Sequence, residues 1–203
     1  MRRFSFVLIL ALTAIPALAQ QIEVTPFFGY RTGGEFQADA INPYGDVEID
    51  DSEAYGLMVN IPLTPWSQIE LMADFQSSSF QDNGDIFIPD QSLGDVDVAY
   101  YHVGYVFQGS DPRIQPFGVI SLGATNINPD VPGLESETAF STSFGGGVKV
   151  FFSKNVGMRF EGRGFYTLLD SNSDTYGNCD YYCYDYGEDM WQSELRAGLI
   201  LRF

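Results

Sequence analysis

The chain has 203 residues with 27 acidic and 10 basic side chains, which gives a formal net charge of −17. This charge excludes nucleic acid as a partner, because phosphate binding requires cationic contacts. The length corresponds to one domain. Charged residues, Gly or Pro interrupt every apolar run beyond the N-terminal one, so no later segment could cross a membrane as a helix, which needs ~20 apolar residues.

The first 19 residues predict a cleaved signal peptide. Arg2 and Arg3 form a basic start, residues 4–15 form a short apolar segment, and residues 17–19 (Ala-Leu-Ala) form a small-residue cleavage site. The apolar segment is too short for a retained membrane anchor. We therefore expect an exported mature domain over residues 20–203.

Eight stretches of this domain alternate with the period of two that is typical of strands. They lie at residues 22–31, 54–63, 69–76, 99–107, 114–125, 140–152, 156–168 and 191–203. In the stretch 114–125 both faces are apolar or small, so its orientation stays open. Pro26 and Pro116 each remove a backbone donor, so we expect them near strand ends or at bulges.

The connections between these stretches alternate in length. Short ones lie at residues 64–67, 108–113 and 153–155, and long ones lie at 33–53, 80–97, 126–138 and 170–189. This alternation is typical of a membrane barrel with short turns on one side and long loops on the other. Aromatic residues are expected at both interfaces. The predicted inner set is Trp66, Phe107, Phe152 and Phe203, and the outer set is Phe80, Phe140, Tyr166 and Trp191.

The faces of the strands favour a membrane barrel over a soluble one. A soluble barrel of the lipocalin type has an apolar inside and a polar outside. Here the charges share a face with Gly, Ser and Thr, while the other face is nearly uncharged and rich in aromatic residues. Charges are costly against lipid but can pair inside a barrel.

The last eight residues carry the clearest family signature. Arg196, Gly198, Leu201 and Phe203 match the slots of the C-terminal sorting signal of bacterial outer-membrane β-barrels. The segments 144–149 and 156–163 are similar to the penultimate hairpin of that family. Over the whole mature chain the sequence resembles the small outer-membrane proteins grouped around OmpA, OmpX and OmpW.

The resemblance implies an all-β fold, an eight-stranded antiparallel up-and-down transmembrane β-barrel. It implies location in the bacterial outer membrane with both termini in the periplasm, the lipid bilayer and the barrel-assembly machinery as partners, and a monomer. Because the chain stops at Phe203, we do not expect the peptidoglycan-binding domain that follows the barrel in OmpA itself.

The charges of the predicted strands should face the lumen as an ion-pair network, since isolated buried charges are expensive. The predicted members are Glu23, Arg31, Glu70, Asp74, Lys149, Arg159, Glu161, Arg163, Glu194, Arg196 and Arg202. An eight-stranded barrel is just wide enough for its own side chains to fill. We expect the network to plug the barrel, and a narrow channel for small solutes is the alternative.

The four predicted loops hold 21 acidic residues and no Lys or Arg. Three interpretations stay open: a solvated repulsive surface, docking of a cationic partner, or Ca²⁺ binding at residues 46–51 and 95–97, which offer hard oxygen ligands. We expect no cofactor beyond this possible Ca²⁺. Direct binding of lipopolysaccharide phosphates by the loops is disfavoured, because no cation there could pair with them.

Cys179 and Cys183 lie close together in the last loop, which favours a disulfide in an exported chain. The only histidine is His102 on an inward face, and nothing in the spacing brings it to Ser141 or Ser143. We expect His102 to be hydrogen-bonded into the ion network, and we do not expect an enzyme. The predicted role is structural in the envelope, or one of surface interaction through four acidic extracellular loops.

Overall fold

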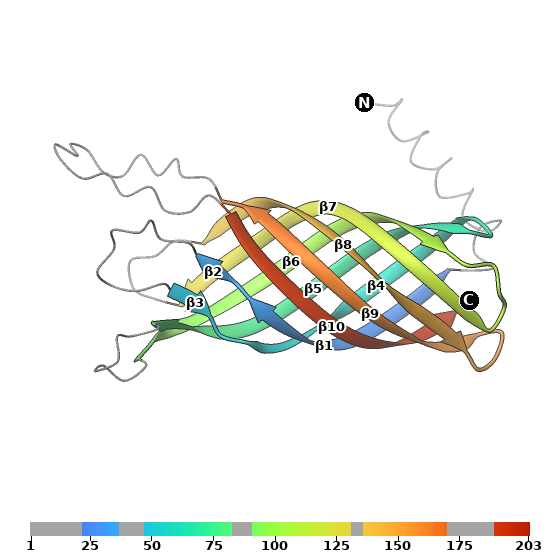
Figure 1. Ribbon diagram of the computed structural model, residues 1–203, viewed down its shortest axis with the longest axis horizontal. Helices are drawn as coiled ribbons and strands as arrows, with labels where there is room; N and C mark the ends of the chain where they lie inside the picture. Colours follow the sequence, from blue (N-terminus) through green and yellow to red (C-terminus); the bar gives the residue numbers. More distant parts are fainter. Residues whose placement is uncertain (1–21, 37–46, 83–90, 131–135, 170–188) are drawn as a thin grey trace, which may run out of the picture.

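The computed structural model describes residues 22–36, 47–82, 91–130, 136–169 and 189–203. The predicted signal peptide, Asp46 and the predicted disulfide between Cys179 and Cys183 lie outside these residues. Ten strands form one sheet (Figure 1). They are β1 (Glu23–Gly33), β2 (Glu35–Phe36), β3 (Val47–Ile49), β4 (Ser52–Thr64), β5 (Ser67–Asp82), β6 (Gln91–Gln108), β7 (Ile114–Asp130), β8 (Glu137–Phe151), β9 (Val156–Leu168) and β10 (Asp189–Arg202).

Eight of these strands close a barrel in which every neighbouring pair is antiparallel. β10 pairs with β1, from Glu23 opposite Arg202 to Gly33 opposite Gln192, so the sheet has no open edge there. The predicted eight-stranded up-and-down fold is confirmed. Three short turns and both ends of the described chain lie at one end, which we call the turn end, and the opposite end is the loop end (Figure 1). In the described part of the chain, no helix is long and apolar enough to cross a membrane.

The predicted facing of the strands is also confirmed. Along β10, buried and exposed residues alternate from Met190 to Ile200. The open orientation of the fifth stretch is resolved, with Phe117 and Ser121 buried and Ile120 and Leu122 exposed. The buried face mixes polar Ser121 and Thr125 with apolar Phe117 and Val119, which is why the sequence pattern left it undecided. Pro26 and Pro116 both lie near the start of their strands, as expected.

The predicted bounds of three long loops were wrong. The stretch 80–97 contains the end of β5 and much of β6, and 126–138 contains the end of β7 and the start of β8. The stretch 33–53 contains β2, β3 and the start of β4. These strands project beyond the apolar part of the barrel. We call this projection the collar and define it as residues 47–53, 77–82, 91–98 and 126–130.

The collar has the opposite polarity to the rest of the barrel. Ile49, Val96, Val98 and Ile127 point inward and form an apolar core together with Met190. On β6 the outward residues between them are Asp95 and Asp97, both exposed. Nearer the turn end, the inside is charged and the outside is apolar. The switch within single strands marks the level at which a lipid environment gives way to water.

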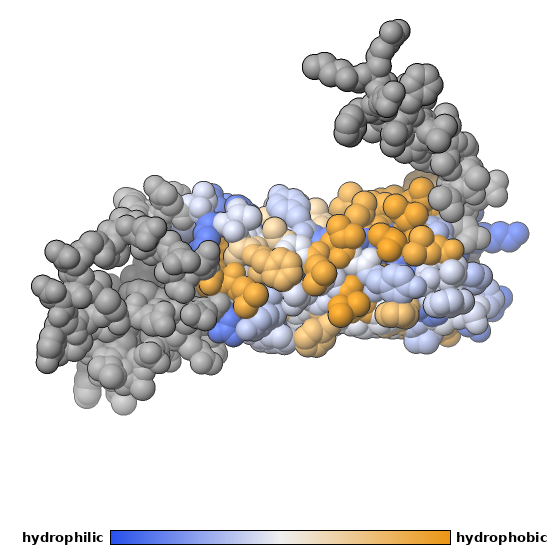
Figure 2. Space-filling model, turned by 90° about the horizontal axis from the view of Figure 1, so that it is seen from above, coloured by the Kyte–Doolittle hydropathy of each residue, from blue (hydrophilic) through white to orange (hydrophobic). Residues whose placement is uncertain are grey.

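On the face seen in Figure 2, hydrophobic patches lie between weakly polar residues along the barrel, and large hydrophobic side chains are exposed on many of its strands. Trp66, Phe107, Phe152 and Phe203 are exposed toward the turn end, as the inner aromatic set requires. Toward the loop end, Phe75 contacts both Tyr55 and Tyr101, with ring centroids 6.0 and 5.9 Å apart. Predicted outer residues Phe140 and Trp191 are exposed as well.

Candidate functional site: the charged interior

The interior of the barrel holds all eleven residues of the predicted ion network, brought together from five strands that each place alternate side chains inward. Ten of these side chains are at most 1% exposed, and only Arg202, near the turn end, is more open, at 23%. They fall into two rings and one smaller cluster.

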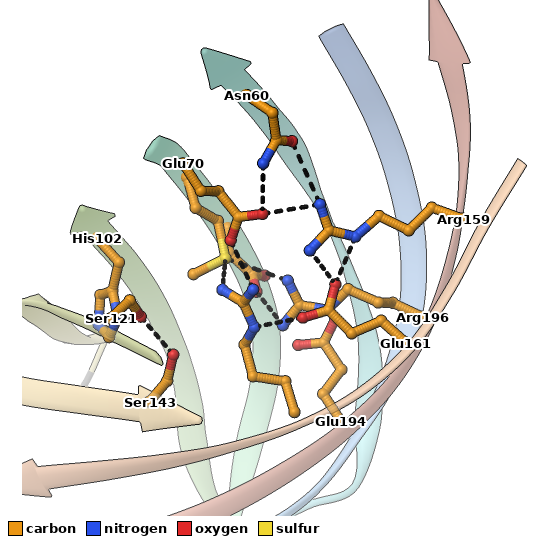
Figure 3. A network of polar contacts seen from close by, with 12 residues as sticks. Asn60, Glu70, His102, Ser121, Ser143, Arg159, Glu161, Glu194 and Arg196 are labelled. Carbon is orange, nitrogen blue, oxygen red and sulfur yellow. Dashed lines mark hydrogen bonds and ion pairs between the residues drawn. The ribbon is translucent and has the colours of Figure 1, made fainter. Parts of the chain in front are cut away.

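The first ring consists of Glu70, Arg159, Glu161 and Arg163. Glu70 accepts from Arg159 Nη1 at 2.7 Å and from Arg163 Nη2 at 2.6 Å. Glu161 pairs with the same two guanidinium groups at 2.8 and 2.6 Å (Figure 3). Asn60 braces the ring by donating to Glu70 and accepting from Arg159. Because Glu70 lies on β5 and the other three lie on β9, four strands away around the sheet, the ring crosses the full width of the barrel.

The second ring consists of Arg31, Asp74, Glu194 and Arg196 and repeats this alternation of charge. Arg31 pairs with Asp74 at 2.7 Å and with Glu194 at 2.6 Å. Arg196 pairs with Glu194 at 3.0 Å and with Asp74 at 3.3 Å. The ring joins β1 and β10 to β5. The longest of its four pairs is that between Arg196 and Asp74.

Met72 connects the two rings. Its Sδ accepts from Arg163 Nη1 of the first ring at 2.9 Å and from Arg196 Nη1 of the second ring at 3.1 Å. The residue lies on β5 between Glu70 and Asp74. Sequence reasoning missed this role, and the only available signal was the inward position of an apolar side chain between two acids.

The third cluster consists of Glu23, Lys149 and Arg202 and lies toward the turn end. Lys149 Nζ donates to Glu23 at 2.7 Å, to Gln68 at 2.8 Å and to Gln108 at 3.0 Å. Arg202 Nη2 pairs with the other oxygen of Glu23 at 2.5 Å. The three donors of the lysine ammonium are therefore all used.

Aromatic rings pack against the guanidinium groups. Arg31 lies 4.8 Å from the ring centre of Tyr100 and 4.9 Å from that of Phe165, and Arg159 lies 4.3 Å from that of Phe117. Such contacts are favourable where the cation is shielded from water. Each of the two ion-pair rings contains two arginines and two carboxylates, so its formal charge is zero. The interior thus combines paired charges with aromatic packing and further hydrogen bonds involving Asn60 and Met72, which is what a stable buried network requires.

His102 does not join the ion network, and the expectation that it would was wrong. Its Nδ1 is hydrogen-bonded to Ser121 and its Nε2 to Ser141, each at 2.8 Å, and Ser121 is bonded in turn to Ser143 at 2.5 Å. The sequence could not show these contacts because the serines lie on two other strands. Both ring nitrogens bond to hydroxyls, so neither bonds to the carboxylate that orients the histidine of a hydrolase triad.

The acidic loops give no metal centre within the described residues, where no group of three or more His, Cys, Asp or Glu is placed to hold an ion. Binding of Ca²⁺ thus stays a prediction. In the predicted assembly signal, Arg196 and Gly198 are buried and Phe203 is exposed.

Comparisons with known proteins agree with this architecture. The family model described as "Outer membrane protein beta-barrel domain" matches residues 5–203. The search of curated proteins found no match. Among solved structures, Neisserial surface protein A is 12% identical, with 90% of this chain and 97% of that chain covered and a TM-score of 0.57.

OprG from Pseudomonas aeruginosa is 13% identical, covers 91% and 97%, and has a TM-score of 0.58. AlkL, solved by solid-state NMR in lipid bilayers, is 11% identical, covers 91% and 90%, and has a TM-score of 0.59. At these identities the similarity concerns the fold alone.

Proposed function

The chain belongs to the outer membrane protein β-barrel domain family, and from this premise we propose that it is a monomeric, non-enzymatic barrel of the bacterial outer membrane with a closed lumen. Its role is structural in the envelope or one of surface interaction, and its working surface is the acidic loop end. No catalytic residue is assigned.

The two rings across the lumen carry this proposal. The first ring spans the barrel from β5 to β9, and the second spans it from β5 to β1 and β10. A transport path along the axis would have to displace buried guanidinium and carboxylate groups from each other. Breaking such a pair in a dry interior costs about 3–5 kcal/mol, which favours a plug over an open channel.

The distribution of cations supports the proposed orientation and surface role. Outside the lumen, the basic residues from residue 20 onward are Arg113 and Lys154, and both lie in turns at the turn end. The short turns and both termini would then face the periplasm, where the barrel-assembly machinery reads the last strand, and the acidic end would face outward. A long-range field of one sign attracts cationic partners.

A liposome-swelling assay tests the closed lumen. Vesicles that contain the folded protein should not swell in a small neutral sugar, at a protein density at which a general porin causes rapid swelling. Folding is checked by the gel mobility of the unheated protein, which shifts on heating. If vesicles with the folded protein swell, the lumen conducts small solutes, and the channel alternative replaces the closed lumen.

A further inference from the structure

The outer face of β4, β5 and β6 has an apolar groove below the collar. Its floor is Ala73, which lies opposite Leu57 on β4 and Tyr101 on β6. Val59, Leu71 and Val103 complete the walls, and the groove encloses about 300 Å³. The small side chain of Ala73 between larger neighbours is what hollows the surface there.

A second hollow lies farther toward the loop end along β5 and is bordered by β4, β6, β7 and the segment before β4. The pairing of β5 with β4 ends at Gln76, and its pairing with β3 begins at Phe80, so the ladder is interrupted at residues 77–79. There Asp50 takes the place of a strand, because its N–H donates to the carbonyl of Ser79 and its carbonyl accepts from Ser78 Oγ. The space left, about 610 Å³, is lined by Asp50, Asp51, Ser52, Ser77, Ser78, Ser79, Asp95, Val96, Asp97 and Asn128. Between groove and hollow lies the aromatic set of Tyr55, Phe75 and Tyr101.

Along β5 the outward side chains change from apolar to aromatic to polar, in the order that suits an amphipathic ligand. Leu71 and Ala73 face the groove, Phe75 lies at the interface, and Ser77 and Ser79 line the polar hollow. The path along β5 from Ala73 to Ser77 is about 13 Å at ~3.3 Å per residue, which is ~10 Å along the barrel axis for a strand tilted by about 40°. This step is long enough to reach from the hydrocarbon region into the headgroup layer, which is ~5–7 Å thick on each side. The hollow is strongly acidic, and the four long loops contain no Lys or Arg. Arg31, opposite Ser52, is buried in the lumen and paired with Asp74 and Glu194.

We propose that the groove and the hollow together bind one lipid that carries a primary-amine headgroup. The acyl chain lies over Ala73, and the ammonium group lies among the carboxylates of Asp95 and Asp97 and the serine hydroxyls. An ammonium group donates in three directions and does not need the compact ligand set that a metal requires. The inference rests on the proposed function, because it needs the collar to begin at the membrane surface.

A groove elsewhere on the barrel provides an internal comparison. It encloses about 630 Å³ beside Ala197, with Gly146 and Gly162 in its floor. The outward residues that follow toward the loop end on β1 and β10 are Thr32 and Ser193, which are uncharged, and Glu53 on β4 is exposed opposite Tyr30. This second groove has no serine-lined hollow with two neighbouring carboxylates above it, so we expect weaker selection of lipids by headgroup there.

Spin-labelled lipids test the proposal. The folded protein is placed in phosphatidylcholine vesicles with trace phosphatidylethanolamine, phosphatidylcholine or phosphatidylglycerol that carries a nitroxide near the chain end. Electron spin resonance then gives the motionally restricted fraction of each lipid. We expect about threefold stronger association of phosphatidylethanolamine than of phosphatidylcholine, as befits a pair of exposed ionic contacts.

The double variant Asp95→Asn/Asp97→Asn should lose this preference, Ala73→Leu should reduce it, and Ala197→Leu should keep it. Equal association of all three lipids with the wild type, or a preference that survives in the double variant, would overturn the inference. If phosphatidylglycerol is motionally restricted only when Ca²⁺ is added, Ca²⁺ bridges its phosphate to the carboxylates, and the inference is overturned. No restricted lipid at all would contradict the proposed membrane barrel itself.

Discussion

Glu70 and Glu161 lie on opposite walls of the barrel and share the same two arginines, Arg159 and Arg163. Each carboxylate neutralises half of each cation, so the ring has no surplus charge and no open member. Removing any one residue leaves the ring with one surplus buried charge. The stability of the barrel and the proposed closure of its lumen therefore rest on the same contacts.

Glu70→Gln should destabilise the barrel by about 3–5 kcal/mol, because two buried arginines then share one carboxylate. The urea midpoint of unfolding in lipid vesicles measures the change. Glu53→Gln on the neighbouring strand is the matched control, since Glu53 is exposed and surface changes usually stay within about 0.5 kcal/mol. Equal midpoints for the two variants would show that the ring contributes nothing.

Lys149→Met should also destabilise by several kcal/mol, of the order of 3 kcal/mol, because it removes three hydrogen bonds and leaves Glu23 with Arg202 alone. Lys154→Met changes the same residue type in an exposed turn five positions away. It should leave the midpoint unchanged. A loss of the same size in both variants would mean that overall charge, not the buried cluster, sets the stability.

The alternation of residues predicted which charges face inward, but not which of them meet. A period of two fixes the side of each residue, whereas the partner across the lumen depends on strand tilt and stagger. For example, Arg163 and Glu70 are far apart in sequence and adjacent in space. The contacts of Met72 with both rings and of His102 with its serines could not be predicted from the sequence for the same reason.

The collar was missed for a different reason. Val96 and Val98 alternate with Asp95 and Asp97, which is a strand pattern, but the loop predicted from the sequence extends to residue 97. On β6 the apolar side chains point inward up to residue 98, and most of them point outward after it, because the surroundings of the strand change from water to lipid. A search for strands whose apolar residues all face outward therefore ends the predicted strand at the collar.

His102→Ala should leave the lipid composition of a producing cell unchanged while lowering stability by about 1–3 kcal/mol, since Ser121 and Ser141 lose a buried partner. Lipid mass spectrometry and the urea midpoint give the two readouts. If free fatty acid or truncated lipid were formed by the wild type and not by the variant, the protein would be an enzyme. Ser110→Ala, in an exposed turn, is the control for both readouts.

Trp66 and Trp191 are the only two tryptophans, and they lie near opposite ends of the apolar surface. In the single-tryptophan variants Trp66→Phe and Trp191→Phe, the remaining residue should be quenched most by lipids brominated near the headgroup. Stronger quenching by lipids brominated near the chain ends would place that end of the barrel at the bilayer centre and refute the two aromatic interfaces.

Asp111 holds the turn before β7, because its Oδ1 accepts from the backbone N–H groups of Arg113 and Ile114 at 2.8 and 3.0 Å. These bonds lower the pKa of Asp111 below its usual 3.8. A lowered folded-state pKa stabilises the fold above the unfolded-state value, and this contribution is lost as the pH falls through the folded-state pKa.

The unfolding midpoint of the wild type should therefore exceed that of Asp111→Ala at neutral pH. The difference should shrink as the pH is taken well below 3.8. A difference that does not change with pH would mean that the ionised carboxylate is not what the turn requires.

Single-channel recording in a planar lipid bilayer, at low and at high salt, tests the closed lumen most directly. The account predicts no discrete conductance steps from protein whose folding is shown by its heat-dependent gel mobility. Reproducible steps from the folded wild type would contradict it, because ions would then pass where the rings of Glu70 and Asp74 cross the barrel.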